Sequence, residues 1–384
     1  MSGFVFNTSR SLVCEVGAAA RLGELCSGLM TAPVLLVTDP GLMKLGLAEA
    51  ALASLEAAGL APVVYEDVMA DPTEGAVLAA AALGREHGVG GVIGFGGGSS
   101  MDVAKLAALL LASDQPLAEI YGVGLARGAR LPLVQVPTTA GTGSEVTPIA
   151  IVTTGSHEKK GVVAAQLIAD LAVLDAALTL GLPPAVTAAT GVDAMVHAIE
   201  AYTSKHRKNP LSDMLAREAL RLLAGSIETA VHDGQDAAAR QNMLLGALLA
   251  GQAFTNAPVA AVHALAYPIG GHFQVSHGLS NSLVLPHVLR FNLPAAAAHY
   301  AELAPLVFPA IAPGAPQAMA AAMIEGFERL IPSLGLETRL SQVGIEAAHV
   351  PMMAEDAMKQ TRLLVNNPRE LTYDDAAAIY SGAL

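Results

Sequence analysis

Short strand-like segments alternate with alanine-rich helical segments through the first 180 residues, and this alternation constrains the fold more than any other feature. PVLLVTD (33–39) has the apolar composition of a buried strand, and LAEAALASLEAAG (47–59) has the pattern of a helix that Gly59 can close. Strands that alternate with helices are typical of a mostly parallel sheet with helices on both faces. The sequence therefore predicts an α/β fold for this part of the chain.

The alternation continues as far as Pro183 and Pro184, after which the strand signals stop and the apolar period is helical almost to the end. We therefore predict an α/β domain over 1–180 and an all-helical domain over 181–384. A crevice between two such domains is a common place for a small-molecule site. The other segments expected in the first domain are the strands APVVYEDV, GGVIGFGGGSS, LPLVQVPTT, TPIAIVTT and LAVLD, and the helices PTEGAVLAAAALGREHG, which Gly88 can end, and SMDVAKLAALLLAS.

Length, charge and composition exclude several classes of protein. The 384 residues suit two domains, and a formal net charge of −13 without a long basic cluster argues against nucleic-acid and anionic-membrane partners. Although 53% of the residues are hydrophobic, many are alanine, and no apolar run approaches the ~18–20 residues of a membrane span. The N-terminus lacks a signal-peptide pattern, and Cys14 and Cys26 match no metal or redox spacing. We expect a cytoplasmic protein.

A glycine-rich turn, GFGGGSSMD (94–102), follows one predicted strand and begins a helix. Unpaired backbone N–H groups and the helix dipole favour an anion at such a place, and glycines let a phosphate approach closely. The stretch narrowly misses the GxGxxG fingerprint, because Ser99 stands at the third glycine position. A phosphate site and a simple corner capped by Ser99 or Ser100 are therefore both open.

A second polar segment, VPTTAGTGSE (136–145), also follows a strand and favours the ligand-binding alternative. Ligands of open parallel sheets lie beyond the carboxyl ends of the strands, where hydroxyls and flexible backbone suit a phosphate and a ribose. The hydroxyl residues of this segment are Thr138, Thr139, Thr142 and Ser144.

Asp39 ends the first predicted strand and has two interpretations. A carboxylate there can bind the 2′-hydroxyl of the adenosine ribose and repel a 2′-phosphate, which favours NAD over NADP. TDPG is also a good turn, in which Asp39 would bind its own neighbouring backbone.

An aspartate and a histidine, Asp193 and His197, stand four residues apart in the apolar segment GVDAMVHAIEAY, so on a helix they share one face. His263 and His277 follow, and a straight helix would hold them ~21 Å apart. We expect Pro268, Gly270 and Gly271 to break that helix and let the two histidines approach each other. One carboxylate and three imidazoles suit Fe(II), Zn(II), Ni(II) or Co(II). Spacing alone leaves other histidines of this half as competitors, namely His206, His232, His272 and His287.

The chain resembles the iron-containing (group III) alcohol dehydrogenase family in four long motifs, which occur in order over nearly its whole length: GFGGGSSMDVAK, VPTTAGTGSEVT, LPPAVTAATGVDAMVHAIEAY and HALAYPIGGHF…HG. The resemblance implies an N-terminal dinucleotide-binding domain, a C-terminal helical domain, and a metal, Fe(II) before Zn(II) or Ni(II), in the cleft between them. It implies NAD as the cofactor. The metal ligands that it implies are Asp193, His197, His263 and His277.

The resemblance also implies further cofactor contacts. Lys160 would approach the cofactor ribose, although its neighbour Lys159 could take that place, and Phe254 would help to wall the nicotinamide pocket. The remaining implied contacts are Asp39, Gly97, Gly98, Ser99, Asp102, Thr138, Thr139, Thr142 and Ser144.

One position departs from the family pattern. Several members carry a histidine four residues after the third ligand, and here that residue is Tyr267, which can relay a proton but is a poor base, with an unperturbed pKa of ~10. The expected reaction is metal-assisted hydride transfer between NAD(H) and a primary alcohol or aldehyde, including small diols and hydroxyaldehydes. The alanine- and leucine-rich helical half makes a homo-oligomer plausible.

Three other functions stay open. A lyase similar to dehydroquinate synthase and a reductase of the maleylacetate type would share this fold, but their anionic substrates call for cations, and none lies inside a ligand motif. A catalytically silent metal- or nucleotide-binding protein is the third alternative, which only Tyr267 favours.

Overall fold

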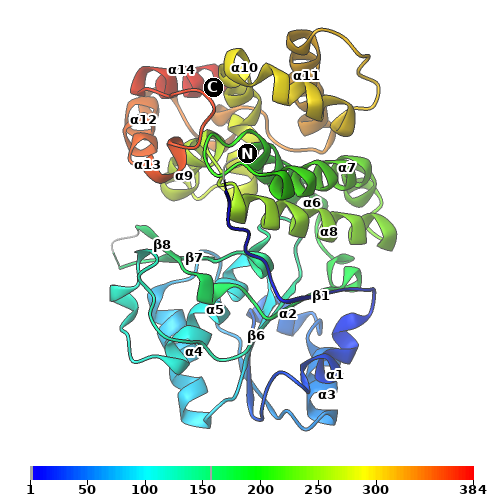
Figure 1. The fold of residues 1–384 in the computed structure, drawn as a ribbon, viewed down its shortest axis with the longest axis vertical. Coiled ribbons are helices and arrows are strands. Elements are labelled where there is room, and N and C mark those ends of the chain that lie inside the picture. Colours follow the sequence, from blue (N-terminus) through cyan, green and yellow to red (C-terminus); the bar gives the residue numbers. More distant parts are fainter. Residues whose placement is uncertain (1–2, 156–157) are drawn as a thin grey trace. The chain divides into compact units, whose positions relative to one another are not determined.

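The computed structural model describes residues 3–155 and 158–384, and the chain divides into two compact units (Figure 1). One unit is Asn7–Leu180. The other is Gly181–Leu384 together with the N-terminal residues through Phe6. Each unit is built around its own core and is described by itself.

The first unit contains a parallel sheet with the strand order β1-β9-β6-β4-β2-β3. In this sheet Leu35 pairs with Val92 and Val92 pairs with Leu133, and the three strands that carry these residues run parallel. The α/β fold with a mostly parallel sheet is therefore confirmed. The strands of this sheet are β1 (Ser11–Cys14), β2 (Val34–Val37), β3 (Pro62–Tyr65), β4 (Val92–Gly96), β6 (Leu133–Pro137) and β9 (Leu171–Leu174).

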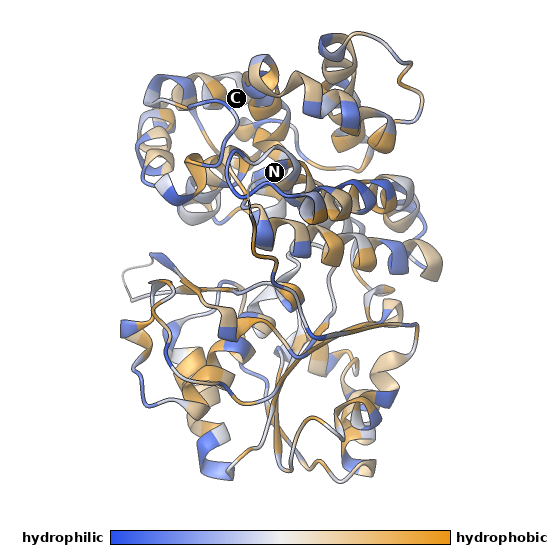
Figure 2. Ribbon diagram, in the orientation of Figure 1, coloured by the Kyte–Doolittle hydropathy of each residue, from blue (hydrophilic) through white to orange (hydrophobic). Residues whose placement is uncertain are grey.

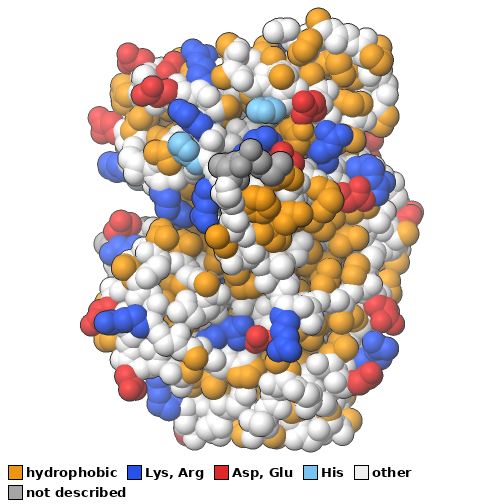
Figure 3. Space-filling view, viewed as in Figure 1, with side chains coloured by type: hydrophobic (Ala, Val, Ile, Leu, Met, Phe, Trp, Pro, Cys, Tyr) orange, Lys and Arg blue, Asp and Glu red, His pale blue; other side chains and the backbone are white. Residues whose placement is uncertain are grey.

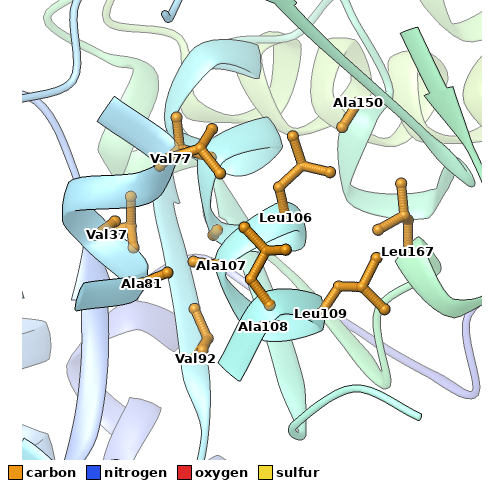
Figure 4. Close-up of a cluster of buried hydrophobic side chains, with 14 of the residues drawn as sticks. Val37, Val77, Ala81, Val92, Leu106, Ala107, Ala108, Leu109, Ala150 and Leu167 are labelled. Atoms are coloured by element: carbon orange, nitrogen blue, oxygen red, sulfur yellow. The ribbon is translucent and has the colours of Figure 1, made fainter. Parts of the chain in front are cut away.

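Helices cover this sheet and bury its central strands on both faces. Figure 4 shows Val37 and Val92 from the strands within one cluster with Val77, Ala81 and Leu106 from the helices. Burial on both faces explains why these strands read as continuous apolar runs in the sequence. The main helices of this unit are α1 (Leu22–Cys26), α2 (Pro40–Lys44), α3 (Glu49–Ala57), α4 (Glu74–His87) and α5 (Gly98–Ala112), and Gly88 ends α4 with φ 63° as expected.

A smaller sheet lies in the same unit, with the order β5-β8-β7, and it was only partly predicted. The segment TPIAIVTT does form a strand, β7 (Ile149–Thr153), but it pairs antiparallel with β8 (Lys159–Val163) outside the main sheet. No strand was predicted at β8, which begins with two lysines and a glycine, or at the short strands β1 and β5 (Gly122–Val123).

The main sheet has a switch point between β2 and β4. The chain leaves β2 toward β3 on one side and returns to β4 on the other, so the carboxyl ends of β2 and β4 flank the place where ligands of such sheets bind. Asp39 follows β2, and the glycine-rich turn follows β4. Neighbouring β6 leads into the second polar segment, starting at Thr138.

The second unit is helical in its described residues, as expected for this half. α6 is buried on nearly all sides by its neighbours α7, α8 and α10, which explains why most of its residues are apolar outside the face that carries Asp193 and His197. In Figure 2 the helices mix hydrophobic and hydrophilic residues along their ribbons. The helices are α6 (Pro184–Thr203), α7 (Pro210–His232), α8 (Ala237–Asn256), α9 (Ala261–Phe273), α10 (His277–Val307), α11 (Pro316–Ser333), α12 (Val350–Met358), α13 (Thr361–Leu364) and α14 (Tyr373–Ala383).

The expected helix break at Pro268, Gly270 and Gly271 is wrong. α9 continues through all three residues and ends at Phe273, where Gln274 adopts the left-handed conformation with φ 56°. Pro268 is tolerated within α9 although it cannot donate a helical hydrogen bond. The chain reverses over Gln274 to Ser276, and α10 begins at His277.

Within the described ranges, no single helix is long and apolar enough to cross a bilayer. α8 and α9 reach the required length and hydropathy only when they are joined, and a bend of 108° separates them. On the face shown in Figure 3, basic side chains lie among acidic ones.

Candidate metal and cofactor sites

Four side chains from three helices of the second unit meet at one point. Asp193 and His197 lie one turn apart on α6, His263 lies near the start of α9, and His277 is the first residue of α10. One potential ligand atom from each lies within 4.8 Å of all the others. From Asp193 Oδ1 the distances are 3.6 Å to His277 Nε2, 3.8 Å to His263 Nε2 and 4.0 Å to His197 Nε2.

These separations fit a shared cation. They exceed hydrogen-bond length, and two ligand atoms bound to one tetrahedral divalent metal lie about 3.4 Å apart. Nε2 of His263 is buried, and it has no hydrogen-bond partner among the described residues. A buried imidazole nitrogen that faces a carboxylate without bonding to it is accounted for if both bind the same ion. The donor set therefore fits a first-row divalent metal.

Glu200 holds His263 in the orientation that ligation needs. Glu200 Oε2 accepts hydrogen bonds from His263 Nδ1 at 2.7 Å and from the Ala260 backbone N at 2.9 Å, while Oε1 accepts from the Val262 backbone N at 2.7 Å. The proton on Nδ1 leaves Nε2 free to bind a metal. Sequence reasoning missed Glu200, although it follows Asp193 by seven residues on the same helix face.

Asn281 holds Asp193 in place, as Glu200 holds His263. Its Nδ2 donates to Asp193 Oδ1 at 2.6 Å and lies 3.2 Å from His277 Nε2. Asn281 lies one turn after His277 on α10, and this spacing was the available sequence signal.

The charges around Asp193 keep it ionised. Burial alone would raise the pKa of its carboxyl, but His197, His277 and His263, with the hydrogen bond from Asn281, lower that pKa overall. The His277 side chain is 40% exposed, whereas those of Asp193, His197 and His263 are at most 5% exposed. The cluster is therefore approachable from the side of His277.

Phe254, which was predicted to wall the nicotinamide pocket, and Tyr267, which was predicted to act in catalysis, lie next to the cluster. Phe254, on α8, stacks on the ring of His197 with centroids 4.4 Å apart. The ring of Tyr267, on α9, lies 6.1 Å from that of His277. Burial raises the pKa of the Tyr267 hydroxyl, and the charge of Arg362 on α13 acts in the opposite direction. Arg362 therefore places a cation next to Tyr267, although it lies outside the ligand motifs.

The competing histidines do not belong to the four-residue group among the described residues. His272 binds Asp356 at 2.5 Å, although it lies on the same helix as His263. His287 lies near Gly382, and burial lowers its pKa. Neither joins the four residues.

In the first unit, the two glycine-bearing segments lie side by side at the carboxyl ends of β4 and β6. A Cβ placed on Gly98 would lie 3.0 Å from the Thr142 side chain, and one on Gly97 would lie 3.7 Å from Thr139 Oγ1. The Thr138 backbone N donates to the Gly96 carbonyl at 3.0 Å. Thr139 and Thr142 are partly exposed, so a ligand can reach them.

The first residues of α5 resolve the alternative of a corner capped by serine. The N-cap is Gly97, which makes no side-chain capping bond, and Ser99 and Ser100 lie inside the first turn. The proposed serine N-cap is therefore wrong. The α5 N-terminus carries the unsatisfied N–H groups that an anion can bind.

Asp39 caps a helix, as its interpretation as a turn residue predicts. It is the N-cap of α2, and its Oδ1 accepts from the Leu42 backbone N at 3.0 Å. Its partly exposed carboxylate still lies at the end of β2, beside the switch point. Capping therefore leaves the other carboxylate oxygen available to a ligand.

Asp102 and Ser144 are tied into a buried network. Ser144 Oγ donates to Asp102 Oδ1 at 2.6 Å, and the Ile151 backbone N donates to Asp102 Oδ2 at 2.9 Å. Lys105 donates to Ser144 Oγ at 2.7 Å. The sequence carried no sign of this lysine's role.

The two neighbouring lysines on β8 have different partners. Lys159 is bound to Asp71 at 2.7 Å. Lys160 is 41% exposed, lies 3.8 Å from Glu158 Oε2, and its Nζ is 5.6 Å from the centre of the Tyr121 ring.

Sequence and structure comparisons agree with this geometry. The chain matches the family described as iron-containing alcohol dehydrogenase over residues 9–176, and the C-terminal part of that family over residues 187–384. It is 39% identical to long-chain-alcohol dehydrogenase 1 of Geobacillus thermodenitrificans, over 96% of this chain and 93% of that protein. It is 35% identical to sulfoacetaldehyde reductase of Bilophila wadsworthia, over 98% of each.

Among solved structures, the chain is similar to a 1,3-propanediol oxidoreductase, with a TM-score of 0.96, 33% identity and full coverage of both chains. The family and the fold class expected from the sequence are therefore confirmed. The chain belongs to the iron-containing alcohol dehydrogenase family, and it is an NAD- and metal-dependent oxidoreductase that transfers a hydride between NAD(H) and an alcohol or aldehyde.

Proposed function

We propose that Asp193, His197, His263 and His277 hold the catalytic divalent metal of this enzyme, Fe(II) before Zn(II) or Ni(II). The observation that carries the proposal is the convergence of these four side chains, with His263 Nε2 buried and unpartnered. The bound cation supplies Lewis acidity to the oxygen of a primary alcohol or aldehyde.

The chain's own residues prepare this site in three ways. Glu200 and Asn281 fix the orientation of His263 and Asp193 before any ligand binds. Phe254 stacks on one face of the His197 ring and supports its orientation. Tyr267 lies beside His277, where its hydroxyl can hold a proton next to the substrate oxygen.

We assign the cofactor to the α/β domain, residues 1–180, and the metal and substrate to the helical domain, residues 181–384. The α5 N-terminus with Gly97, Gly98 and Ser99 would bind the pyrophosphate, and Asp39 the adenosine ribose. Lys160 would approach the second ribose. NAD serves as the hydride acceptor or donor. The other assigned contacts are Asp102, Thr138, Thr139, Thr142 and Ser144.

The similar proteins act on different substrates by name: long-chain alcohols, sulfoacetaldehyde and 1,3-propanediol. We therefore propose a primary alcohol or small diol and its aldehyde as the substrate class. A cytoplasmic homo-oligomer is the expected setting.

The test is NADH production by the purified chain, reconstituted with Fe(II), Zn(II) or Ni(II), over a panel of primary alcohols and diols. Net NADH formation with at least one of them supports a dehydrogenase, because a lyase that recycles its NAD forms no net NADH. His263→Ala should lose both the bound metal and nearly all turnover, since it removes a buried ligand.

His272→Ala is the matched control, because His272 lies on the same helix and binds Asp356 instead of the cluster. This variant should keep its metal and its activity. A metal-free His263→Ala protein with full activity would refute the assignment of the site.

A further inference from the structure

Lys105 is a fully buried ammonium in the middle of the proposed cofactor region. It lies on α5, and its side chain is 0% exposed. Its Nζ donates to Ser144 Oγ at 2.7 Å, to Thr147 Oγ1 at 3.0 Å and to the Ile149 carbonyl at 2.7 Å. An ammonium group has three N–H donors, so these three acceptors use all of them. Lys105 therefore has no donor left for a phosphate.

The acceptors of Lys105 connect separate parts of that region. Ser144 and Thr147 belong to the loop between β6 and β7, and Ile149 is the first residue of β7. Asp102, one turn before Lys105 on α5, accepts from Ser144 Oγ and from the Ile151 backbone N. The network thus joins the helix that begins at the glycine-rich turn, the hydroxyl-bearing loop, and the small sheet whose strand β8 carries Lys160.

A buried charge is stable only where hydrogen-bond partners and opposite charges compensate for its loss of hydration. Asp102 Oδ1 lies 3.7 Å from Lys105 Nζ, and Glu145 is also buried nearby. Burial lowers the pKa of Lys105 to about 8, against the opposing effect of Asp102 and Glu145. The contacts that offset the cost of burying Lys105 also hold the surrounding groups in place.

The directions of the hydrogen bonds in the network restrict which ligand groups Ser144 and Asp102 can bind. The hydroxyl of Ser144 has one proton, which it donates to Asp102, and it accepts from Lys105. It can therefore offer a cofactor only an acceptor. The carboxylate of Asp102 is 14% exposed and is an acceptor as well. Phosphate oxygens are acceptors, so neither residue can bind them directly.

We propose that Lys105 is a positioning residue that fixes the cofactor-bearing segments relative to one another and leaves Ser144 and Asp102 to accept hydrogen bonds from a ribose hydroxyl or the nicotinamide carboxamide. This inference rests on the proposed cofactor site. The phosphates of the cofactor would bind the backbone N–H groups at the start of α5.

The first test replaces Lys105 by methionine, which keeps most of the side-chain volume and removes the three donors. The dissociation constant of NADH, measured by fluorescence titration, should rise by at least about tenfold, the effect of losing one charged hydrogen bond. The KM for NAD should rise more than kcat falls, and the metal content should be unchanged.

Leu106→Ala is the matched control for a loss of stability. Leu106 is a buried neighbour on the same helix, and its apolar side chain packs into the cluster of Figure 4 and takes no part in the hydrogen bonds of the network. This variant should unfold at a lower temperature but bind NADH with unchanged affinity. If it weakens NADH binding as much as Lys105→Met does, Lys105 contributes only stability and the inference is wrong.

Thr147→Val provides a second variant should Lys105→Met fail to fold. It is nearly isosteric and removes one acceptor of Lys105, together with a long hydrogen bond of 3.5 Å from Thr147 Oγ1 to the Ser144 carbonyl oxygen. NADH affinity should fall by a few-fold, and an unchanged affinity would contradict the positioning role. A wild-type protein that binds no NADH would instead refute the proposed cofactor site itself.

Ser144→Ala tests the directions of the hydrogen bonds. It should weaken NADH more than ADP, because ADP has the diphosphate but lacks the nicotinamide ribose and carboxamide. Equal weakening of both ligands would mean that Ser144 binds the phosphates, which would overturn the acceptor assignment.

Discussion

Glu200 shows how one carboxylate can set the geometry of the proposed metal site without being one of its ligands. Its two oxygens accept from two backbone N–H groups at the start of α9 and from the ring of His263. The same residue thereby anchors the first turn of α9 to α6 and selects the tautomer of the third ligand.

Replacing Glu200 by glutamine should lower metal affinity by about 10–100-fold, the usual cost of losing such an outer partner. A glutamine has only one acceptor oxygen, so its amide N–H₂ must face a backbone or ring donor. Metal titration of the apoprotein measures the effect. Glu228→Gln, an exposed change on α7, is the control and should bind metal normally; equal affinities for both variants would show that Glu200 has no such role.

Asp39→Gly should raise the preference for NADP relative to NAD by about fivefold or more, because it removes a negative charge worth ~1 kcal/mol against a nearby phosphate. The ratio of kcat/KM for the two cofactors is the measurement. Asp39→Asn keeps the α2 cap but loses the charge, so it should shift the ratio in the same direction. If neither variant changes the ratio, Asp39 only caps the helix.

At the scale of elements, the close approach of α6 and α10 brings Asp193 and His277 together. Gly278 makes this approach possible, because a Cβ at this position would lie 2.3 Å from the Ala189 carbonyl oxygen and 2.6 Å from its carbon. Both contacts are with backbone, which cannot rotate away. The two helices can therefore meet at this distance only with glycine at 278.

Gly278→Ala should destabilise the protein by about 1–3 kcal/mol through overpacking and should also weaken metal binding, because it moves His277 away from Asp193. Urea unfolding and metal titration are the two measurements. Gly271→Ala on α9 is the control, since nothing lies within 4 Å of the added Cβ, and it should stabilise its helix slightly. Normal metal affinity in Gly278→Ala would contradict this role of the glycine.

At the scale of the molecule, the proposed function gives the two compact units different tasks, one for each ligand of the reaction. The proposed metal ligands all belong to the unit Gly181–Leu384, and the assigned contacts to NAD, apart from Phe254, belong to the unit Asn7–Leu180. A ligand that binds only the folded state stabilises the part that holds it, by about 2.7 kcal/mol at a hundred times its dissociation constant.

Hydrogen exchange followed by mass spectrometry should therefore separate the two ligands. Removal of the metal by a chelator should speed amide exchange in α6, α9 and the first turns of α10. NADH should slow exchange at the start of α5 and in the loop from Thr138 to Ser144. The assignment of one ligand to each unit fails if both ligands protect the same segments.

Local patterns in the sequence were sufficient for several features of this protein. The alternation of strands and helices before residue 180, the helical half after it, and the pairing of Asp193 with His197 on one face all follow from residues close together in the chain. Glycine signals at helix ends, such as Gly88, are equally local. These features depend on backbone preferences and burial periodicity, which a single segment contains in full.

Only the tertiary structure decided which distant groups meet. It placed the reversal after α9 at Gln274 instead of at Pro268, and it brought His263 and His277 together across that turn while leaving His272 with Asp356. It also formed the small sheet with β8 and buried Lys105 among acceptors 39 to 44 residues away. Such contacts depend on how helices and strands pack, and packing is a property of the whole chain that no local pattern contains.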